Sequence, residues 1–248
     1  MTIRILTGMP GVFAGPLQEG ILRIAQEKGL AAVELVNLRD FSRDRHRSID
    51  DAPYGGGPGM VLMVEPVVRA LRSLPEPAGR REILLLSPQG ERLQQSRVEQ
   101  LAAAGDLVLV CGRYKGVDER VRRFVSGELS LGDYVISGGE LAAAVVADAV
   151  VRLLPGALGC YDSALGDSHT SGLLDSSVYT RPEEFEGLKV PEVLLSGHHA
   201  RIAAWRREDA LRRTLMRRPE LLESALLTPA DEASLRRLGW KAGEGSGA

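Results

Sequence analysis

The chain has 248 residues, of which 44% are hydrophobic and 26% are charged, and its formal net charge is −2. These values are typical of a globular protein with one large domain, or with a medium domain and a small one. They argue against nucleic-acid binding over the whole surface, although a local basic patch remains compatible with them.

The cysteines and the apolar runs argue against several further classes of protein. Cys111 and Cys160 form no CxxC motif, which argues against a zinc site and against a disulfide framework. The apolar run at the N-terminus is too short and too charged for a signal peptide. The longest aliphatic stretch, 141–154, is interrupted by Asp148 and Arg152 and is too short to span a membrane. We therefore expect a cytoplasmic protein without a membrane span.

Short apolar runs alternate with segments of helical periodicity through the first 154 residues. Strands are expected at 3–6, 32–38, 83–86, 107–111 and 129–131. Helices are expected at 17–25, where Gly29 would end the helix, and at 117–124 and 140–154. Two further helices are expected to begin at Pro66 and at a capping box formed by Ser96 and Glu99. The alternation predicts an α/β fold with a mainly parallel sheet.

The composition changes near Gly159. Residues 160–177 are rich in Ser, Asp, Gly and Thr, which predicts a flexible interdomain linker. Residues 178–248 begin with a polar segment and continue into arginine-rich helical sequence. We therefore expect an α/β domain at 1–159, a linker at 160–177 and a small helical domain at 178–248.

Three loops that follow apolar strands are candidates for a ligand site: 87–90, 112–116 and 132–139. Ligands of open α/β sheets lie beyond the carboxyl ends of the strands, and small residues let the backbone approach them. Any one of these loops is better explained as a tight turn, but the three loops together favour a ligand site. None is a Walker A or GxGxxG sequence, so the residues alone do not distinguish S-adenosylmethionine from another adenosine-containing ligand.

Charged residues form two further candidates. Arg152 interrupts an apolar helix end and Asp167 lies in the predicted linker, so each is either a surface residue or part of a site. Arg206, Arg213 and Arg217 share one helical face and, like the basic run 43–47, would suit phosphate contacts. A solvated helix face with internal ion pairs explains the same pattern. No metal site is expected, because the neighbouring His198 and His199 point apart.

Several runs of residues together resemble the signatures of the bacterial tRNA (guanine-N1)-methyltransferases. They occur in the order of that family, as far as about Leu227, at 44–47, 50–60, 86–90, 111–114, 132–141, 172–175, 179–182, 193–197 and 217–222. The resemblance implies a SPOUT fold, with a parallel sheet and a deep C-terminal trefoil knot. It also implies a homodimer with active sites at the interface, and methyl transfer from S-adenosylmethionine to N1 of the guanine immediately 3′ of the anticodon in tRNA.

The resemblance also implies roles for particular residues. Asp167 matches the general base, which takes the N1 proton, and Arg152 matches the catalytic arginine, which stabilises charge on O6. Cofactor contacts are implied at Leu86, Ser87, Pro88, Gly112, Leu131, Gly132, Asp133, Tyr134, Val135, Ile136, Gly138 and Gly139. For tRNA we expect contacts from Arg45, His46, Gly57, Gly59, Arg206, Arg213 and Arg217.

The chain departs from the family pattern at Lys115, where a glutamate is expected, at Ala142 and at His169. Three other interpretations remain: a non-catalytic RNA-binding protein of the same fold, a methyltransferase for another RNA atom, and an adenosine-nucleotide enzyme. The presence of Asp167 and Arg152 disfavours the first, and the missing phosphate motifs disfavour the third. The family's use of a divalent ion such as magnesium is implied too, but the sequence offers no dedicated ligand set.

Overall fold

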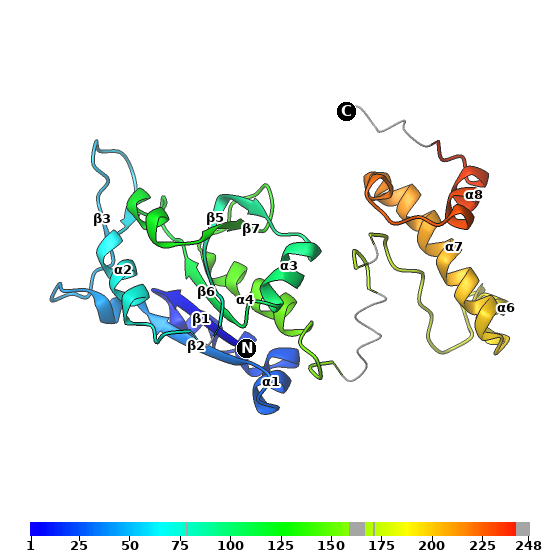
Figure 1. The fold of residues 1–248 in the computed structure, drawn as a ribbon, viewed down its shortest axis with the longest axis horizontal. Coiled ribbons are helices and arrows are strands. Elements are labelled where there is room, and N and C mark those ends of the chain that lie inside the picture. Colours follow the sequence, from blue (N-terminus) through cyan, green and yellow to red (C-terminus); the bar gives the residue numbers. More distant parts are fainter. Residues whose placement is uncertain (78, 159–166, 171, 242–248) are drawn as a thin grey trace. The chain divides into compact units, whose positions relative to one another are not determined.

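The computed structural model describes residues 1–77, 79–158, 167–170 and 172–241, and the chain divides into two compact units (Figure 1). Unit 1 is Met1–Tyr161 and unit 2 is Asp162–Ala248. The linker expected at 160–177 lies outside the described residues at 160–166 and at 171. No helix in the described ranges is long and apolar enough to cross a membrane.

Unit 1 is built on a five-stranded parallel sheet with the strand order β2-β1-β6-β5-β7, which confirms the predicted α/β class. The strands are β1 (Thr2–Thr7), β2 (Ala32–Asn37), β5 (Arg81–Arg92), β6 (Asp106–Cys111) and β7 (Gly127–Ser130), with a separate hairpin of β3 (Asp50–Asp51) and β4 (Val61–Leu62). The helices are α1 (Gly20–Glu27), α2 (Val64–Ser73), α3 (Gln95–Ala102) and α4 (Gly139–Val151), with 3-10 turns at Pro10–Phe13, Pro16–Gln18, Leu38–Phe41 and Glu119–Phe124.

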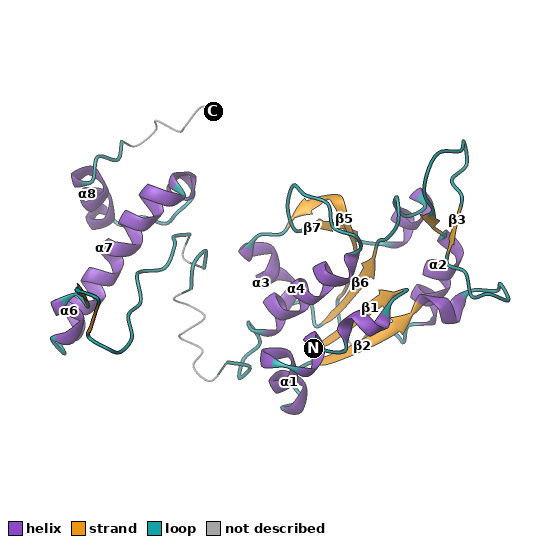
Figure 2. Cartoon of the chain, turned by 180° about the vertical axis from the view of Figure 1, so that it is seen from behind, coloured by secondary structure: helices purple, strands orange, loops and turns teal. Residues whose placement is uncertain are grey.

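The central strand β6 shows why this sheet is covered on both faces. Its side chains alternate, so that Leu107, Leu109 and Cys111 join one buried cluster while Val108 and Val110 join the other. The first cluster is completed by α1, α3 and α4, and the second by α2 (Figure 2). A strand that is buried on both faces has a continuous apolar sequence, which is why the sequence 107–111 predicts a strand.

One local prediction was wrong, and two were right in place but differ in type or length. Ser96 and Glu99 form no capping box, because α3 begins at Gln95 and its cap residue Gln94 makes no side-chain cap. The helix expected at 117–124 is a short 3-10 turn after Asp118, whose carboxylate accepts from the backbone of Arg120 at 2.9 Å. The strand expected at 83–86 continues to Arg92 after a register shift that follows Leu86.

Unit 2 consists of helices with one short hairpin. Its elements are β8 (Glu184–Phe185), β9 (Leu188–Lys189), α6 (Glu192–Leu195), α7 (His199–Arg217), a 3-10 turn at Pro219–Glu223 and α8 (Pro229–Arg237). Its buried core cluster contains Leu173, Leu211, Leu222 and Leu235.

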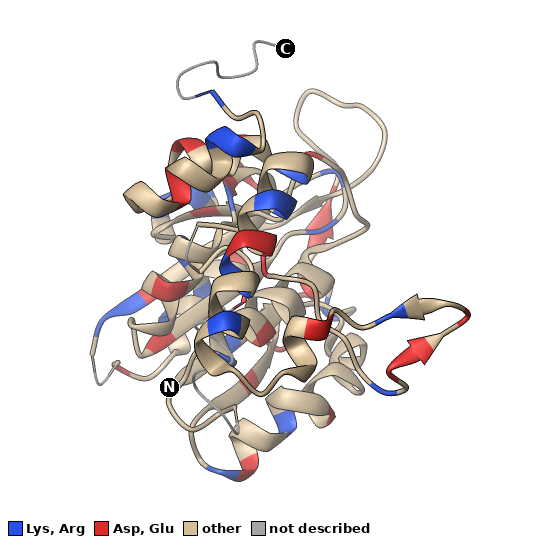
Figure 3. Ribbon diagram, turned by 90° about the vertical axis from the view of Figure 1, so that its right-hand side faces the viewer, with Lys and Arg blue, Asp and Glu red and all other residues tan. Residues whose placement is uncertain are grey.

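Over the whole chain, residues of both charge signs are interspersed along the ribbon (Figure 3), in keeping with the near-neutral net charge of the protein.

Residues 173–177, which the sequence placed in the linker, contact α7 in the structure. Leu173 is buried in the core, and the backbone amide of Leu174 donates to Thr214 Oγ1 at 2.9 Å. The amide of Ser177 donates to Asp209 Oδ2 at 2.7 Å. These contacts make the segment part of unit 2.

Candidate functional site

A cavity of about 380 Å³ lies at the carboxyl ends of β6 and β7 and beside the middle of β5, where the register of β5 shifts after Leu86. All three loops singled out from the sequence contribute to its lining. The lining contains every predicted cofactor residue except Asp133: Leu86, Ser87, Pro88, Gly112, Leu131, Gly132, Tyr134, Val135, Ile136, Gly138 and Gly139. Asp133 lies outside, with its carboxylate exposed and 3.4 Å from Arg92.

Glycine is required where these loops meet. The amide of Gly139 donates to the carbonyl of Gly112 at 2.7 Å, which joins the start of α4 to the loop after β6. A Cβ at Gly139 would lie 2.8 Å from the Cα of Cys111, and one at Gly112 would lie 2.8 Å from the carbonyl oxygen of Leu86. Both neighbours are backbone atoms, which cannot move aside cheaply. The backbone therefore forms this wall of the cavity.

A buried carboxylate supports the same wall. Glu140, in the first turn of α4, is 3% exposed and accepts a hydrogen bond from Thr7 Oγ1 at 2.8 Å. Its other oxygen is 3.5 Å from Nε of Arg113, which lines the cavity. The sequence did not single out Glu140, because an acid in the first turn of a helix is most often exposed. Three segments far apart in sequence therefore meet at one side chain.

The loop after β6 also contains a residue in an uncommon conformation. Tyr114 lines the cavity and has φ of 62°, in the left-handed region that non-glycine residues seldom occupy. Burial raises the pKa of the Tyr114 hydroxyl, and the neighbouring Asp50 carboxylate raises it further. The phenol is therefore neutral near pH 7, and its hydroxyl is directed to the Asp50 carboxylate.

The glycine-rich stretch connects β3 to β4 and is attached to the cavity. Val61 pairs with Tyr114 and Leu62 pairs with Val117 in isolated β-bridges. Within the stretch, Gly57 and Gly59 have φ of 115° and 88°, which only glycine adopts without strain. The two predicted tRNA contacts in this loop thus lie on a segment that is hydrogen-bonded to the cavity's own loop.

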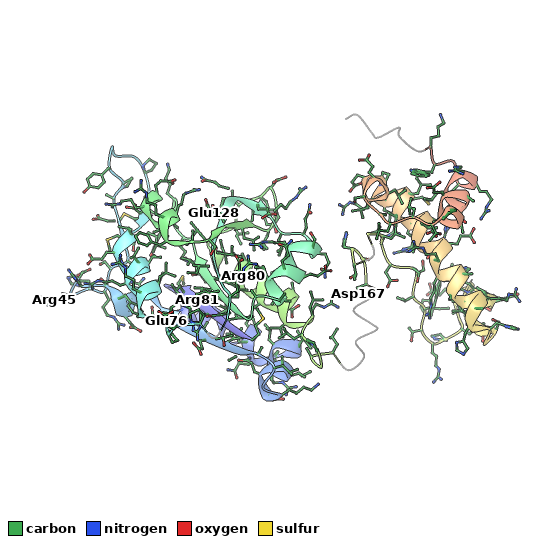
Figure 4. All side chains as sticks on the ribbon, in the orientation of Figure 1. Arg45, Glu76, Arg80, Arg81, Glu128 and Asp167 are labelled. Carbon is green, nitrogen blue, oxygen red and sulfur yellow. The ribbon has the colours of Figure 1, made fainter. Side chains whose placement is uncertain are left out.

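The predicted basic contacts Arg45 and His46 lie in an exposed loop before β3, and Arg45 extends away from the sheet (Figure 4). Asp44 organises this loop, since its carboxylate accepts from the amides of His46 and Ser48. Hydrogen bonding with Ser48, and then with His46, lowers the pKa of Asp44 to about 2. The carboxylate is therefore charged at neutral pH and fixes the backbone from which Arg45 projects.

Comparison with known proteins decides the family. Residues 1–224 match the profile described as tRNA (Guanine-1)-methyltransferase TrmD. The chain belongs to this family. Among its relatives named tRNA (guanine-N(1)-)-methyltransferase, the protein of Syntrophotalea carbinolica is 51% identical over 99% of both chains. The protein of Dictyoglomus turgidum is 50% identical over 93% of this chain and 94% of its own. The protein of Geobacillus kaustophilus is 49% identical over 95% and 97%.

The two catalytic candidates of this TrmD family chain belong to different units. Arg152 caps the C-terminus of α4 in unit 1 and is partly buried. Asp167 is the first described residue of unit 2, is partly buried, and accepts from the amide of Thr170 in a turn through its carbonyl (Figure 4). Each residue is therefore held on ordered backbone of its own unit.

The three candidate arginines on α7 of this TrmD family chain differ in their surroundings. Arg206 and Arg217 are exposed. Arg213 is partly buried and donates from Nε to the carbonyl of Asp175 at 3.0 Å and from Nη1 to Ser177 Oγ at 3.1 Å. Arg213 therefore holds the segment 173–177 against α7. This structural role accounts for an arginine at this position of α7 without any contact to RNA.

Proposed function

We propose that this protein transfers a methyl group from S-adenosylmethionine to N1 of the guanine immediately 3′ of the anticodon in tRNA. The observation that carries the proposal is the backbone-walled cavity of a chain that belongs to the TrmD family. A substrate that is tRNA makes the cytoplasm the expected location.

The cavity fits an adenosine-containing methyl donor. Its volume of about 380 Å³ falls within the range of small-molecule sites, roughly 300–1,000 Å³. Leu86, Leu131 and Ile136 supply apolar contacts for a flat base, and the backbone of the three loops supplies polar ones. When bound, the cofactor supplies an electrophilic methyl group on a sulfonium.

The chemistry requires a base and a cation beside the guanine. Guanine N1 carries a proton and is a poor nucleophile, so a carboxylate that removes the proton during transfer raises its reactivity. We assign this role to Asp167. The negative charge that then develops on O6 is stabilised by a guanidinium, and we assign that role to Arg152.

The proposal includes a deep trefoil knot at the C-terminal part of unit 1 and a homodimer with active sites at its interface. The hydrogen bond from Gly139 to Gly112 supports the knot, because α4 starts where an earlier loop already lies. The dimer is supported by large apolar side chains exposed beside the cavity and on α4: Tyr134, Val135, Leu141 and Val145. Exposed apolar groups gathered in this way mark an interaction surface.

For tRNA binding we propose the exposed residues Arg45, His46, Arg206 and Arg217, together with Gly57 and Gly59. The linker expected at 160–177 is proposed to end before Leu173, so that the helical domain includes 173–177. Magnesium has less support. The described residues contain no group of three or more His, Cys, Asp or Glu side chains that could hold a metal ion.

The test is a methyl-transfer assay with Asp167→Asn and a tRNA transcript that carries guanine 3′ of the anticodon. Wild type is expected to form N1-methylguanine, identified by nucleoside mass spectrometry, and a transcript with adenine at that position is expected to stay unmodified. Asp167→Asn is expected to lower kcat by about 10²–10⁴-fold with little change in cofactor affinity. Glu186→Gln, at an exposed carboxylate of the same unit, serves as the matched control. Equal rates for Asp167→Asn and wild type would show that Asp167 is not the base. Transfer of the methyl group to another atom of the RNA would overturn the proposed reaction.

A further inference from the structure

Three cationic side chains line the cavity, and their ion pairing differs. Arg113 is 3.5 Å from Glu140, and Arg122 is 2.8 Å from Glu119 and also pairs with Glu128. Lys115 also lines the cavity, and its ammonium makes no ion pair or hydrogen bond within the described part of the chain. Of these three cavity cations, Lys115 is thus the one that has no counter-charge among the described residues.

The backbone and stem of Lys115 join the cavity to the glycine-rich loop. Its amide donates to the carbonyl of Met60 at 3.0 Å, and the amide of Leu62 donates to the carbonyl of the next residue, Gly116, at 3.0 Å. A Cβ at Gly59 would lie 3.5 Å from Cβ of Lys115 and 3.8 Å from its Cδ. The aliphatic stem therefore lies beside Gly59, while the side chain as a whole remains exposed.

Charge decides which ligand group an unpaired ammonium at this junction can hold. The proposed cofactor carries one carboxylate but also an ammonium and a sulfonium, so its net charge is positive and a lysine beside it gains little. The proposed RNA substrate carries one negative charge per nucleotide, and its phosphates attract lysine at any sequence. An exposed, flexible ammonium suits this kind of point-charge contact.

We propose that Lys115 binds a backbone phosphate of the substrate tRNA, at the junction of the cofactor cavity and the glycine-rich loop. This inference rests on the proposed function, because it takes tRNA as the substrate. The contact places a phosphate next to the cavity without reading the base, so it contributes affinity and positioning but not sequence selectivity. Lys115 is accordingly a positioning residue, which acts on the guanine through the RNA backbone.

The test compares Lys115→Met, which keeps the stem and removes the charge, with Lys115→Arg and Lys28→Met. Lys28 is an exposed lysine whose Nζ donates to the carbonyl of Gly156 at 2.9 Å, and it serves as the control for the loss of one positive charge. The Kd of a tRNA transcript is measured by fluorescence anisotropy over a series of salt concentrations. The Kd of S-adenosylmethionine is measured by calorimetry without RNA.

Lys115→Met is expected to weaken tRNA binding roughly fivefold at low salt and to lower the slope of log Kd against log salt concentration by about one. Lys115→Arg is expected to keep the wild-type slope, as is Lys28→Met, and the cofactor Kd is expected to stay unchanged in all variants. A weaker cofactor Kd in Lys115→Met with an unchanged salt slope would show that the lysine holds the cofactor carboxylate and would overturn the proposal. Equal slopes for Lys115→Met and Lys28→Met would overturn it as well.

Failure of the proposed function gives a different pattern. If wild type forms no N1-methylguanine but Lys115→Met still loses one unit of salt slope, the reaction is wrong and the phosphate contact stands. If wild type methylates the guanine and the slopes do not differ, the reaction stands and Lys115 has no phosphate contact.

Discussion

The two units of this protein are stabilised in different ways. In unit 1, aliphatic side chains fill the space on both faces of the sheet, and β6 is buried along its whole length. Both units bury some polar side chains, such as Glu140 in unit 1, but the core cluster of unit 2 contains only four buried leucines among the described residues, beside the buried polar residues Asp209, Thr214 and Asp231. A small core leaves little stability in reserve, so hydrogen bonds and ion pairs matter more in unit 2.

This difference suits the parts that the two units have in the proposed reaction. A cofactor cavity needs a frame that does not change shape, and the buried sheet provides one. A unit that binds RNA needs a charged surface, and its stability then depends on pH and salt. The chain contains a separate probe for each unit, since Trp205 and Trp240 belong to unit 2 and the buried thiol of Cys111 belongs to unit 1.

The largest effect is expected from a cavity in the smaller core. Leu211→Ala removes a side chain that is 1% exposed and should lower the free energy of unfolding of unit 2 by about 3 kcal/mol. Urea unfolding followed by tryptophan fluorescence measures this change. Leu226→Ala, at a leucine that is 90% exposed, is the control and should change little.

The same variant tests whether the units unfold separately. Burial, and then the charge of Glu140, raise the pKa of the Cys111 thiol, so it is protonated and shielded in the folded protein. In a Cys160→Ser background, labelling of Cys111 therefore reports opening of unit 1. Leu211→Ala is expected to leave its labelling rate unchanged, and a parallel rise in that rate would show that the two units unfold together.

A second prediction concerns unit 1. Gly139→Ala places a Cβ 2.8 Å from the Cα of Cys111 and 3.0 Å from the amide nitrogen of Gly112, so the loops must move apart. We expect the affinity for S-adenosylmethionine to fall by about tenfold or more, the equivalent of ~1.4 kcal/mol, with no change in the tryptophan transition. Gly127→Ala is the control, because the nearest atom to its added Cβ is a leucine methyl at 3.8 Å. Equal cofactor affinities in the two variants would contradict the backbone-walled site.

A third prediction concerns the start of α8. Asp231 accepts from Arg207 at 2.9 and 3.0 Å and forms a capping box with Thr228. Asp231→Ala should lower the stability of unit 2 by about 1–2 kcal/mol. Glu232→Ala, which breaks only the exposed pair with Arg236, should lower it by less than about 0.5 kcal/mol.

The contribution of Asp231 also depends on pH. Hydrogen bonds from Arg207 hold the pKa of Asp231 below its ordinary value of about 3.9 in the folded state. A depressed folded pKa stabilises the fold fully above the unfolded pKa, and that stabilisation is lost as the pH falls through the folded value. The difference in stability between wild type and Asp231→Ala should therefore be constant from pH 5 to 7 and shrink below about pH 4. A difference that grows in acid would contradict the ion pair.

Local patterns were enough to predict most strands and the loops that line the cavity. The apolar run at 107–111 predicts a strand, and the glycines at 112, 138 and 139 mark loops that line the cavity in the structure. The parallel sheet and the C-terminal helices followed from the same kind of pattern. The role of each site residue remains a prediction, which the proposed variants test.

The features that were missed depend on contacts between distant residues. Glu140 is buried because Thr7 and Arg113 meet it, and neither lies near it in sequence. Residues 173–177 have a linker-like composition, yet Thr214, Asp209 and Arg213 bind their backbone or side chains. Ser96 and Glu99 have the spacing of a capping box, but the helix already begins at Gln95. Spacing alone does not show where the preceding strand ends.

The strand order has a consequence for synthesis of the chain on the ribosome. β1 is synthesised before β6, yet its register pairs Thr2 with Asp106, and the side chain of Arg4 also bonds to Asp106 at 2.8 Å. Until β6 has been made, the early strands have a partner on one edge only, and the apolar residues of β1 stay accessible to other nascent chains. Pairing over such long sequence separations slows folding and prolongs this exposure. The interior position of β1 therefore leaves one edge of this strand unpaired until β6 has been synthesised.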